Sequence, residues 1–429
     1  MTGDEIVQLC RRHTIYEWSA QAKVDPIPVA RAAGVYFWTP EGKRFLDFNS
    51  QLMCTNVGHS HPTVVRAIQE QAATLAYANP FMATEPRARL GAKLAAITPG
   101  DIDTFFFTNG GADANENAIR IARVVSGRHK VLARYRSYHG GTAGAIALTG
   151  DARRWASEPG MPGVVRAPDF HRWGRRDPEP VETCLRELED VIRFEGGQTI
   201  AAFVMEPVVG TNGILIPPDG YMRGVREICD RHGILLISDE VMSGWGRTGK
   251  WFAVDHWDVV PDMITTAKGI TSGYVPLGAV IVSDKIADYF EDRMLWCGLT
   301  YSGHPLACAA GVATLQVYEE DRLIENAAAV GRHLGQRLED IKTRHASVGD
   351  VRYIGLFSAL EIVKDRTTKE PIDPLTETNR YLRANGLFTF IFHNVLFVVP
   401  PLCITEVQLD EGLAIVEKAL EITDAIAQG

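Results

Sequence analysis

The sequence of 429 residues predicts an α/β protein whose main sheet is mostly parallel and flanked by helices. Two observations predict it. Short apolar runs alternate along the chain with longer stretches of helical periodicity, which is the pattern of βαβ units. Several runs also end at a polar or ionisable residue, and open α/β sheets bind ligands beyond the carboxyl ends of their strands. The runs are 104–107, 130–133, 200–205, 234–237 and 261–266.

The chain is too long for one ordinary hydrophobic core, so we expect two domains. Residues 1–55 are expected to be the N-terminal segment of a small domain, residues 56–325 a large domain, and residues 326–429 the C-terminal part of the small α+β domain. A hydrophobic content of 46% and a charged content of 23% are typical of a globular protein. The net charge of −9 gives no general electrostatic attraction for nucleic acid, and we expect no nucleic-acid partner.

The seven cysteines are scattered and form no Cys-x-x-Cys pair, so the sequence predicts neither a disulfide framework nor a zinc site. His59 and His61 could suggest a metal, but no third ligand follows at a useful spacing, and we expect no metal. The N-terminal residues lack the basic-then-apolar plan of a signal peptide, and no apolar run approaches membrane-spanning length. We therefore expect a cytoplasmic protein with no membrane contact.

Local patterns predict the elements of the N-terminal part. Residues 35–48 read as a hairpin. Helical periodicity over 63–77 ends at Asn79-Pro80, and a second helix is expected over 86–97.

The strand at 104–107 runs through a glycine turn, Gly110 and Gly111, directly into a helix over 113–125. A strand, a glycine turn and a helix start together form a phosphate cradle. Glycines let backbone N–H groups approach an anion closely, and the helix N-terminus adds partial positive charge. Two adjacent glycines are a weak signal by themselves, since turns use them often.

Residues 150–180 show little periodicity, so we expect a long loop there, in which Arg172, Arg175 and Arg176 form a solvated basic cluster. The elements expected after it are helices over 182–194 and 219–232, a strand after the turn at 273–278, helical periodicity from 306 to about 341, small-domain strands within 352–361 and 396–402, and a last helix from the capping box of Thr405 and Gln408 to about Ala425.

Two ionisable residues follow two of the predicted strands. Asp239, with Glu240, comes at the end of the run 234–237, and Lys268 comes after the run 261–266. Both side chains should therefore reach the same edge of the sheet. An amine that condenses with an aldehyde and an acid that keeps a pyridine nitrogen protonated are the minimum equipment for pyridoxal 5'-phosphate (PLP). Taken singly, an Asp here could be a helix N-cap and a Lys an ordinary surface residue.

Residues 239–249 read Asp-Glu-Val-Met-Ser-Gly-Trp-Gly-Arg-Thr-Gly, and Lys268 precedes a glycine further on. This string and spacing resemble class III, fold-type I PLP-dependent aminotransferases, and in particular omega-aminotransferases. Other strings similar to the family's occur in its order: Asn-Val-Gly-His-Ser-His-Pro at 56–62, Thr-Asn-Gly-Gly-Ala-Asp-Ala-Asn-Glu at 108–116, Ser-Tyr-His-Gly-Gly at 137–141 and Thr-Tyr-Ser-Gly-His-Pro at 300–305. The resemblance implies an aminotransferase with PLP as cofactor and a seven-stranded sheet in its large domain.

The resemblance also implies roles for the matched residues. Lys268 and Asp239 are the expected catalytic residues, Tyr138 would stack on the pyridine ring, and Val241 would pack on the opposite face. Thr300 would reach the phosphate in the neighbouring subunit, which implies a homodimer, or a dimer of dimers, with shared active sites. The expected cofactor-binding residues are Gly110, Gly111, Ala112, Tyr138, His139, Glu206, Asp239, Val241, Lys268 and Thr300.

This chain departs from the family in the glycine turn. Gly110, Ala112 and Asp113 stand where Ser, Ser or Thr, and Glu are usual. Without those hydroxyls, we expect the phosphate to be held by backbone amides and by Thr300.

A second departure concerns the substrate. Many omega-aminotransferases of the family carry an arginine shortly before a Pro-Pro-Leu segment, and it grips the substrate carboxylate through two hydrogen bonds. Residues 386–394 contain no arginine and are apolar and aromatic instead. This favours an ω-amino acid, a taurine-like compound or a plain amine as donor, with pyruvate or another keto acid as acceptor. The expected pocket residues are Trp18, Leu52, Met53, Phe81 from the partner, Tyr138, Phe392 and His393.

Other functions stay open at this point. An aminomutase or a decarboxylating aminotransferase would use the same residues. A non-catalytic PLP-binding protein is disfavoured because Lys268 and Asp239 are both present. A nicotinamide-dependent Rossmann enzyme is excluded because no Gly-x-Gly-x-x-Gly follows the early strands.

Overall fold

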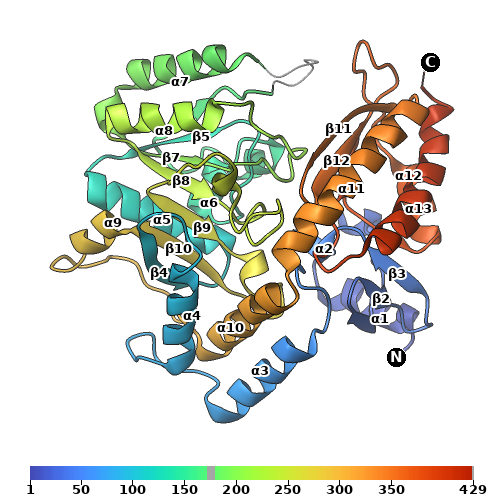
Figure 1. Cartoon of the computed structure of the whole chain (residues 1–429), viewed down its shortest axis with the longest axis horizontal. Coiled ribbons are helices and arrows are strands. Elements are labelled where there is room, and N and C mark those ends of the chain that lie inside the picture. Colours follow the sequence, from blue (N-terminus) through green and yellow to red (C-terminus); the bar gives the residue numbers. More distant parts are fainter. Residues whose placement is uncertain (172–178, 428–429) are drawn as a thin grey trace.

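Three sheets organise the chain in the computed structural model, which describes residues 1–171 and 179–427 (Figure 1). The predicted basic cluster of Arg172, Arg175 and Arg176 lies outside the described residues. The largest sheet has seven strands in the order β4-β10-β9-β8-β7-β5-β6. Its strands are β4 Ile102–Thr108, β5 Lys130–Arg134, β6 Val164–Ala167, β7 Ile200–Met205, β8 Leu235–Asp239, β9 Met263–Thr266 and β10 Gly278–Ser283.

This sheet is mostly parallel. Strands β6, β5, β7, β8 and β9 pair in parallel, and β10 runs antiparallel to both β9 and β4. The carboxyl ends of β4, β5, β7, β8 and β9 therefore lie at one edge, together with the amino end of β10. The predicted seven-stranded, mostly parallel sheet is confirmed.

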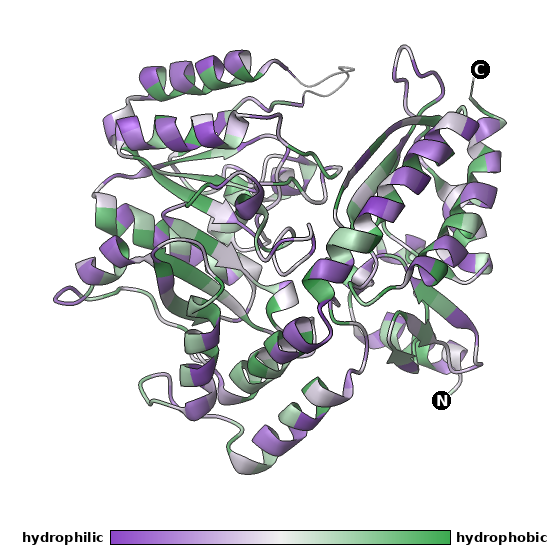
Figure 2. Cartoon of the chain, viewed as in Figure 1, coloured by the Kyte–Doolittle hydropathy of each residue, from purple (hydrophilic) through white to green (hydrophobic). Residues whose placement is uncertain are grey.

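Helices cover both faces of the sheet. Leu235 and Ile237 of β8 pack with Ala118 of α5 (Gly111–Ser126) on one face. Leu236 belongs to the cluster on the other face, with Leu188 of α7 (Val181–Glu195) and Val225 of α8 (Tyr221–His232). Apolar side chains on both sides of a strand are typical of a parallel sheet buried between helices. Figure 2 shows the central strands mostly green and α7 and α8 banded purple and green.

The remaining helices on the large-sheet side frame the site and join it to the rest. They are α3 Pro62–Thr74, α4 Glu85–Ala95, α6 Ala143–Leu148, α9 Asp284–Tyr289 and α10 Pro305–Glu320. Helical periodicity predicted from 306 to about 341 is divided in the structure into α10 and α11 (Leu323–Arg344). The break falls at Arg322, whose φ of 52° is left-handed and cannot continue a right-handed helix.

Two smaller sheets lie together on the other side of the molecule, the blue strands beside the orange and red elements in Figure 1. One has the order β11-β12-β15-β14 and is antiparallel. In the other, β13 from the C-terminal part pairs in parallel with β3 from the N-terminal part. The strands are β1 Arg31–Ala33, β2 Tyr36–Trp38, β3 Arg44–Asp47, β11 Val348–Ile354, β12 Phe357–Ile362, β13 Leu387–Phe388, β14 Ile391–Phe392 and β15 Val395–Val398. The helices are α1 Gly3–His13, α2 Ser50–Met53, α11, α12 Thr376–Ala384 and α13 Glu406–Asp424.

Several local predictions are confirmed. The hairpin within 35–48 forms as β2 and β3, α8 ends at Gly233 in the left-handed region, and Thr405 with Gln408 makes the capping box of α13. The prediction of an unbroken loop over 150–180 is wrong, because β6 lies inside it. Among the residues that the structure describes, this strand pairs with β5 alone, and it is half-buried over most of its length, so its sequence carries neither a continuous apolar run nor a clear alternation. The domain boundaries at 55/56 and 325/326 stay predictions.

Arg247 ties the two sides together. Its guanidinium is fully buried and donates to the carbonyl oxygens of Leu356 and Pro400, to Ser50 Oγ and to Asn56 Oδ1. Burial lowers the pKa of Arg247 to about 10. Because these partners come from the N-terminal and C-terminal parts of the chain and Arg247 itself from the central part, Arg247 fixes how the three parts meet beside the sheet edge. No helix in the described parts of the chain is both long and apolar enough to cross a membrane.

Candidate active site

A cavity of about 460 Å³ lies at the edge of the large sheet where the parallel strands end. Five strand ends contribute to its lining: Asn109–Ala112 after β4, Tyr138–Gly141 after β5, Glu206 after β7, Asp239 at the end of β8, and Lys268 after β9. Residues far apart in sequence meet here because parallel strands present their carboxyl ends at one edge.

The glycine turn begins a helix that points its N-terminus at the cavity. Gly110 is the N-cap of α5, and no side chain caps the helix there. The turn is also tightly packed, since a Cβ on Gly111 would lie 2.9 Å from both methyl carbons of Val241. Uncapped N–H groups at the start of a helix bind anions, so this turn is suited to a phosphate.

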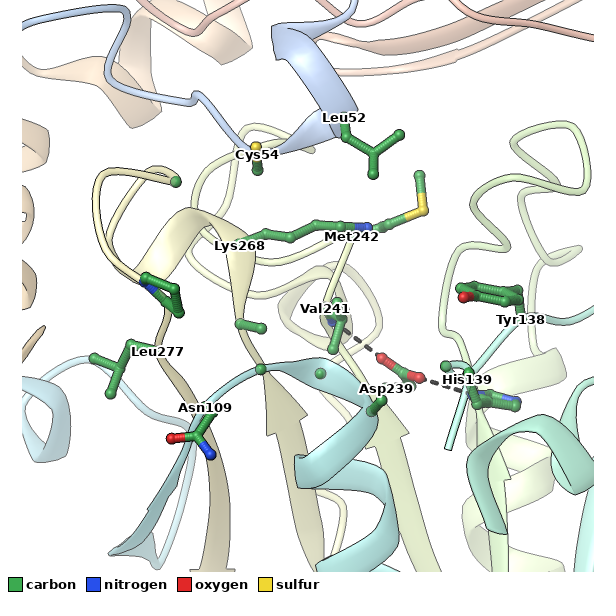
Figure 3. A pocket seen from close by; sticks show the side chains of 18 of the residues that line it. Leu52, Cys54, Asn109, Tyr138, His139, Asp239, Val241, Met242, Lys268 and Leu277 are labelled. Carbon is green, nitrogen blue, oxygen red and sulfur yellow. Dashed lines mark hydrogen bonds and ion pairs between the residues drawn. The ribbon is translucent and has the colours of Figure 1, made fainter. Parts of the chain in front are cut away.

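Asp239 lies at the bottom of the cavity and is held by three hydrogen bonds. His139 Nδ1 lies 2.7 Å from Asp239 Oδ2, and Asn115 Nδ2 donates to the same oxygen at 2.8 Å. The backbone N–H of Val241 donates to Oδ1 at 3.1 Å. Figure 3 shows Asp239 with its bonds to His139 and Val241, and Lys268 extended across the cavity above it. The carboxylate orientation is therefore fixed by the protein.

Asn115 is a site residue that the sequence reasoning missed. It is buried in the first turns of α5 and donates both to Asp239 and to the carbonyl oxygen of His139, at 2.7 Å. Its own Oδ1 accepts from Thr265 Oγ1 of β9 at 2.8 Å. Two signals could have found it: Asn115 stands within the string at 108–116 that resembles the family's, and it is a polar residue on the helix face turned toward the sheet.

Glu206 supports the segment that carries Tyr138. Its two carboxylate oxygens accept from the backbone N–H of Tyr138 at 3.0 Å and of Gly210 at 2.7 Å. Burial raises the pKa of Glu206. The segment also comes very close to the glycine turn, because a Cβ on Gly140 would lie 2.5 Å from the Cβ of Ala112. Glu206 thus positions the Tyr138 ring by holding its backbone.

Lys268 begins a short 3-10 helix directly after β9, with a left-handed φ of 46°. Non-glycine residues in this region are uncommon and are often found at functional sites. Burial lowers the pKa of the Lys268 amine. A lowered pKa leaves a larger fraction of the lysine side chains neutral near pH 7, and the neutral amine is the form that acts as nucleophile and base.

The N-terminal part of the chain covers the cavity. Leu52 and Cys54 reach it from the segment around α2, shown in blue at the top of Figure 3. Trp18 also lines it, with its ring edge-on to Tyr138 at 6.1 Å between centroids. Of the expected cofactor residues, Thr300 is the one that does not line this cavity; it is exposed in the single chain.

Four expected substrate residues lie elsewhere. Met53 is buried in a cluster with Val208 and Met242 rather than lining the cavity, since α2 turns it into the core. Phe81 is 99% exposed in the single chain. His393 makes an ion pair with Asp373 at 3.1 Å, and Phe392 packs on the His393 ring at 4.5 Å between centroids. The other expected pocket residues, Trp18, Leu52 and Tyr138, do line the cavity.

A second missed residue, Arg153, lies beside the cavity wall. Its guanidinium carbon is 3.8 Å from the centroid of the Tyr138 ring and 5.6 Å from that of Phe392. Asp151 accepts from Arg153 Nε at 3.0 and 3.1 Å, and Thr211 Oγ1 accepts from Nη2 at 2.7 Å. Arg153 lies within the region predicted as a loop, where no pattern distinguished it from other charged residues.

The two histidines considered as metal ligands have other partners. His59 Nε2 pairs with Asp47 at 2.9 Å, and His61 Nε2 lies 3.4 Å from Asp321. Within residues 1–171 and 179–427, no group of three or more His, Cys, Asp or Glu side chains is arranged to hold a metal ion.

Comparison with known proteins identifies close relatives over the whole chain. A family model described as class III aminotransferase matches residues 18–420. An omega-aminotransferase of Caulobacter vibrioides is 36% identical, covering 94% of this chain and 95% of the relative. A taurine–pyruvate aminotransferase of Bilophila wadsworthia is 33% identical, covering 98% of each. The solved structure of a taurine:2-oxoglutarate aminotransferase from Bifidobacterium kashiwanohense, in complex with PLP and glutamate, is 43% identical with a TM-score of 0.96 and covers 99% of each chain.

Proposed function

The chain belongs to the class III aminotransferases, and from that premise we propose that it transfers the amino group of an ω-amino acid, a taurine-like compound or a plain amine to pyruvate or another keto acid. The predicted fold-type I architecture is confirmed by this membership, and PLP is the cofactor of the family. The observation that supports the proposal best is that Lys268 and Asp239 face one cavity at the carboxyl edge of the sheet.

The residues of the cavity fit PLP. The uncapped start of α5 suits the phosphate, the Tyr138 ring suits one face of the pyridine, and Val241 suits the other. Asp239 suits the ring nitrogen, because its oxygens lie at the bottom of the cavity and its orientation is fixed. When bound, PLP supplies an electron sink that stabilises negative charge on the carbon that carries the amine.

The chain's own residues perform the proton transfers. Lys268 reaches across the cavity, and its lowered pKa would let the neutral amine accept the proton from the amine-bearing carbon of the substrate and pass it on to the bound cofactor. Asp239 would keep the pyridine nitrogen of bound PLP protonated through its negative carboxylate. Asn115 and His139 keep that carboxylate in place, and Glu206 keeps the Tyr138 ring over the site.

The donor class is supported by the walls of the cavity and by the relatives. Leu52, Val241 and Met242 give the cavity an apolar surface on the side that Lys268 faces. The relatives act, by their names, on omega-amino donors or on taurine. An apolar wall accommodates the carbon chain between an amine and a distant acidic group.

The test is a set of donor half-reactions followed through the absorbance of the bound cofactor, with α-alanine, β-alanine, taurine and 1-phenylethylamine. We expect β-alanine, taurine or 1-phenylethylamine to convert the cofactor faster than α-alanine does. Conversion only by glutamate or another dicarboxylic α-amino acid contradicts the proposal. Release of carbon dioxide, or turnover without any acceptor, identifies the decarboxylating enzyme or the aminomutase instead.

We also propose a homodimer, or a dimer of dimers, in which the Thr300 hydroxyl contacts the phosphate held by the partner subunit. Thr300 lies outside its own chain's cavity, and the loop around it carries exposed apolar side chains, Trp296 and Tyr301. The Tyr77 hydroxyl donates to the Thr300 carbonyl at 2.9 Å, which brings the exposed Phe81 segment beside this loop. Such exposed apolar surface marks interfaces.

Light scattering and a cofactor titration test the homodimer. We expect a dimer or tetramer in solution, and Thr300→Val should weaken PLP binding by about tenfold, the value of one charge-assisted hydrogen bond. A monomeric wild-type protein, or a Thr300→Val variant that binds PLP as tightly as wild type, contradicts shared sites.

A further inference from the structure

We propose that Arg153 binds the acidic group of the substrates, a carboxylate or a sulfonate, and thereby selects amino acids, aminosulfonates and keto acids over amines without an acidic group. The inference rests on the proposed aminotransferase function and says how that site recognises its substrates. Arg153 is not one of the pocket residues expected from the sequence, and it lies beside the cavity lining rather than in it.

The acceptor of the proposed reaction gives the first argument. Every keto acid acceptor carries a carboxylate next to the carbon that receives the amine. Placing a carboxylate against an apolar surface without a partner is costly, and a charged donor within reach offsets that cost better than a neutral one. Residues 386–394, where relatives of the family hold an arginine, contain none.

Arg153 brings a guanidinium to the Tyr138 side of the cavity from another part of the chain. It lies in the large-sheet part, between α6 and β6, and its guanidinium is stacked on Tyr138, which lines the cavity. The same guanidinium carbon lies 5.6 Å from the centroid of the Phe392 ring, and Phe392 belongs to the segment 386–394 that lacks the arginine. The guanidinium therefore lies where the two sides of the molecule meet above the Tyr138 ring.

The bonding of Arg153 leaves one nitrogen for a ligand. Nε and Nη2 donate to Asp151, and Nη2 also donates to Thr211. Among the described residues, Nη1 has no hydrogen-bond partner, and it is not one of the fully enclosed polar atoms. The side chain keeps 17% of its surface exposed. A guanidinium with a fixed plane and a free terminal nitrogen is well suited to bind an oxyanion.

Asp151 sets the direction of that plane. It accepts from two nitrogens of Arg153 and from Asn212 Nδ2 at 3.0 Å, so the pair is anchored to the loop after β7. Because the Arg153 backbone N–H also donates to Asp151 at 2.9 Å, the guanidinium cannot swing away without breaking several bonds. The position of Nη1 is thus preorganised, which reduces the entropy lost when an anion binds.

Arg153 also acts electrostatically on the reacting centre. Burial lowers the pKa of Lys268 most, and the positive charge of Arg153 lowers it further. The two cationic groups are therefore close enough to influence one another. By contrast Arg247, the arginine of the Gly-Arg-Thr-Gly string, has both terminal nitrogens bonded within the protein core and is not available to a substrate.

The experiment compares donors with and without an acidic group in the holoenzyme. Donor half-reactions of wild type, Arg153→Gln and a control, Arg154→Gln, are followed with taurine, β-alanine and 1-phenylethylamine. Arg154 is a suitable control because it carries the same charge one residue away but pairs with Glu158. Arg153→Gln should lower kcat/KM for taurine and β-alanine by about 10- to 100-fold, as expected for a lost charged hydrogen bond, and that for 1-phenylethylamine by less than about threefold.

A binding measurement accompanies the kinetics. Calorimetry gives the Kd of ethanesulfonate and of propionate, which have no amine to react. Both should bind at least about tenfold more weakly to Arg153→Gln than to wild type or to Arg154→Gln. Loss of ethanesulfonate binding alone identifies a sulfonate site, and loss of propionate binding alone a carboxylate site; either supports an anion-binding Arg153.

The outcomes separate this inference from the proposed function. If wild type converts no amine donor, the proposed function fails whatever Arg153 does. If wild type converts the donors and Arg153→Gln slows all three equally, or none, with unchanged Kd values, Arg153 is a structural residue and the inference is wrong. If Arg153→Gln does not fold, Arg153→Lys replaces it, with the Kd of both anions expected to weaken several-fold and unchanged values overturning the inference.

Discussion

The floor and the rim of the cavity are built in opposite ways. The floor comprises Asn115, His139, Asp239 and Thr265, all buried and all from the large-sheet part. The rim, as we use the word, comprises Trp18 and Leu52, which line the cavity, and the adjoining group of Asp151, Arg153 and Phe392, in which Arg153 stacks on the lining residue Tyr138. Every member of the floor is hydrogen-bonded to another member. The rim draws on the N-terminal, central and C-terminal parts, and its Trp18 and Leu52 side chains remain more than half exposed.

This difference separates two tasks. A closed network of buried hydrogen bonds keeps one geometry, which suits a group that stays in the site through every cycle. A rim assembled from three segments can change one residue without disturbing the others, which suits the choice of substrate. We therefore expect substitutions in the floor to affect all substrates alike and those in the rim to discriminate among them.

The largest effect is expected for Lys268→Ala. Removing the amine removes the proton carrier for every donor, so the half-reaction rate should fall by about 10⁴-fold or more with taurine and 1-phenylethylamine alike. Lys285→Ala, at an exposed position of α9, is the control and should keep the wild-type rate. Stopped-flow absorbance gives both rates. A variant that retained a tenth of the activity with any donor would contradict the assignment of Lys268 as the proton carrier.

Asp239→Asn should cause the second-largest loss of activity. The amide keeps the size of the side chain but not its charge, so it cannot hold a proton at the pyridine nitrogen, and kcat/KM should fall by about 10³-fold for all donors. Asp262→Asn is a matched control at the opposite end of the sheet, where Asp262 pairs with Arg226 and accepts from the Leu236 N–H. It should lower the melting temperature and leave kcat/KM within about threefold of wild type. Equal kinetic losses in the two variants would contradict a special role for Asp239.

The two reacting residues, Asp239 of the floor and Lys268 above it, were predictable from the sequence for a physical reason, whereas Asn115 and Thr265 of the floor were not predicted. Asp239 and Lys268 each follow a short apolar run, and parallel strands bring their carboxyl ends together, so their meeting follows from topology alone. Asn115 escaped because its role depends on which way the first turns of α5 face. That orientation is set by packing against β9 and β10, not by local sequence.

The rim was less predictable because its members meet only through tertiary packing. Leu52 and Met53 are neighbours in sequence, yet the irregular backbone of α2 directs Leu52 to the cavity and Met53 into the core. Arg153 lies in a stretch without periodicity, and its contact with Phe392 joins residues from opposite halves of the chain. A pattern of period 2 or 3.6 cannot report such contacts.

Glu240 sharpens the comparison, because it is a buried acid directly beside Asp239 that takes no part in the floor. Ser243 Oγ and the Val254 N–H donate to it, and burial raises its pKa to about 7. Between pH 4.5 and 7 the folded protein binds this proton and the unfolded chain does not, so the free energy of unfolding should fall as pH rises through that window. The loss should total about 3 kcal/mol.

Denaturant unfolding at pH 5 and pH 8 measures this loss in the free energy of unfolding. Glu240→Gln cannot ionise, so its stability relative to wild type should improve between the two pH values by about 3 kcal/mol. Glu227→Gln, at an exposed position of α8, is the control and should show no such change. A parallel pH dependence of wild type and Glu240→Gln would show that Glu240 is ionised throughout.

The smallest effect is expected for Asn115→Ala, which removes support from the floor without removing a reacting group. Asp239 loses one of its three hydrogen bonds, so kcat/KM should fall by about tenfold, by the same factor for taurine and for 1-phenylethylamine. Asn117→Ala is the matched control, since the Asn117 side chain is also buried in α5 but, within the described parts of the chain, donates to the Asp113 carbonyl and to no residue of the site. It should lower stability and leave kcat/KM unchanged. A donor-dependent loss in Asn115→Ala would mean that the floor also senses the substrate, and the division between floor and rim would no longer hold.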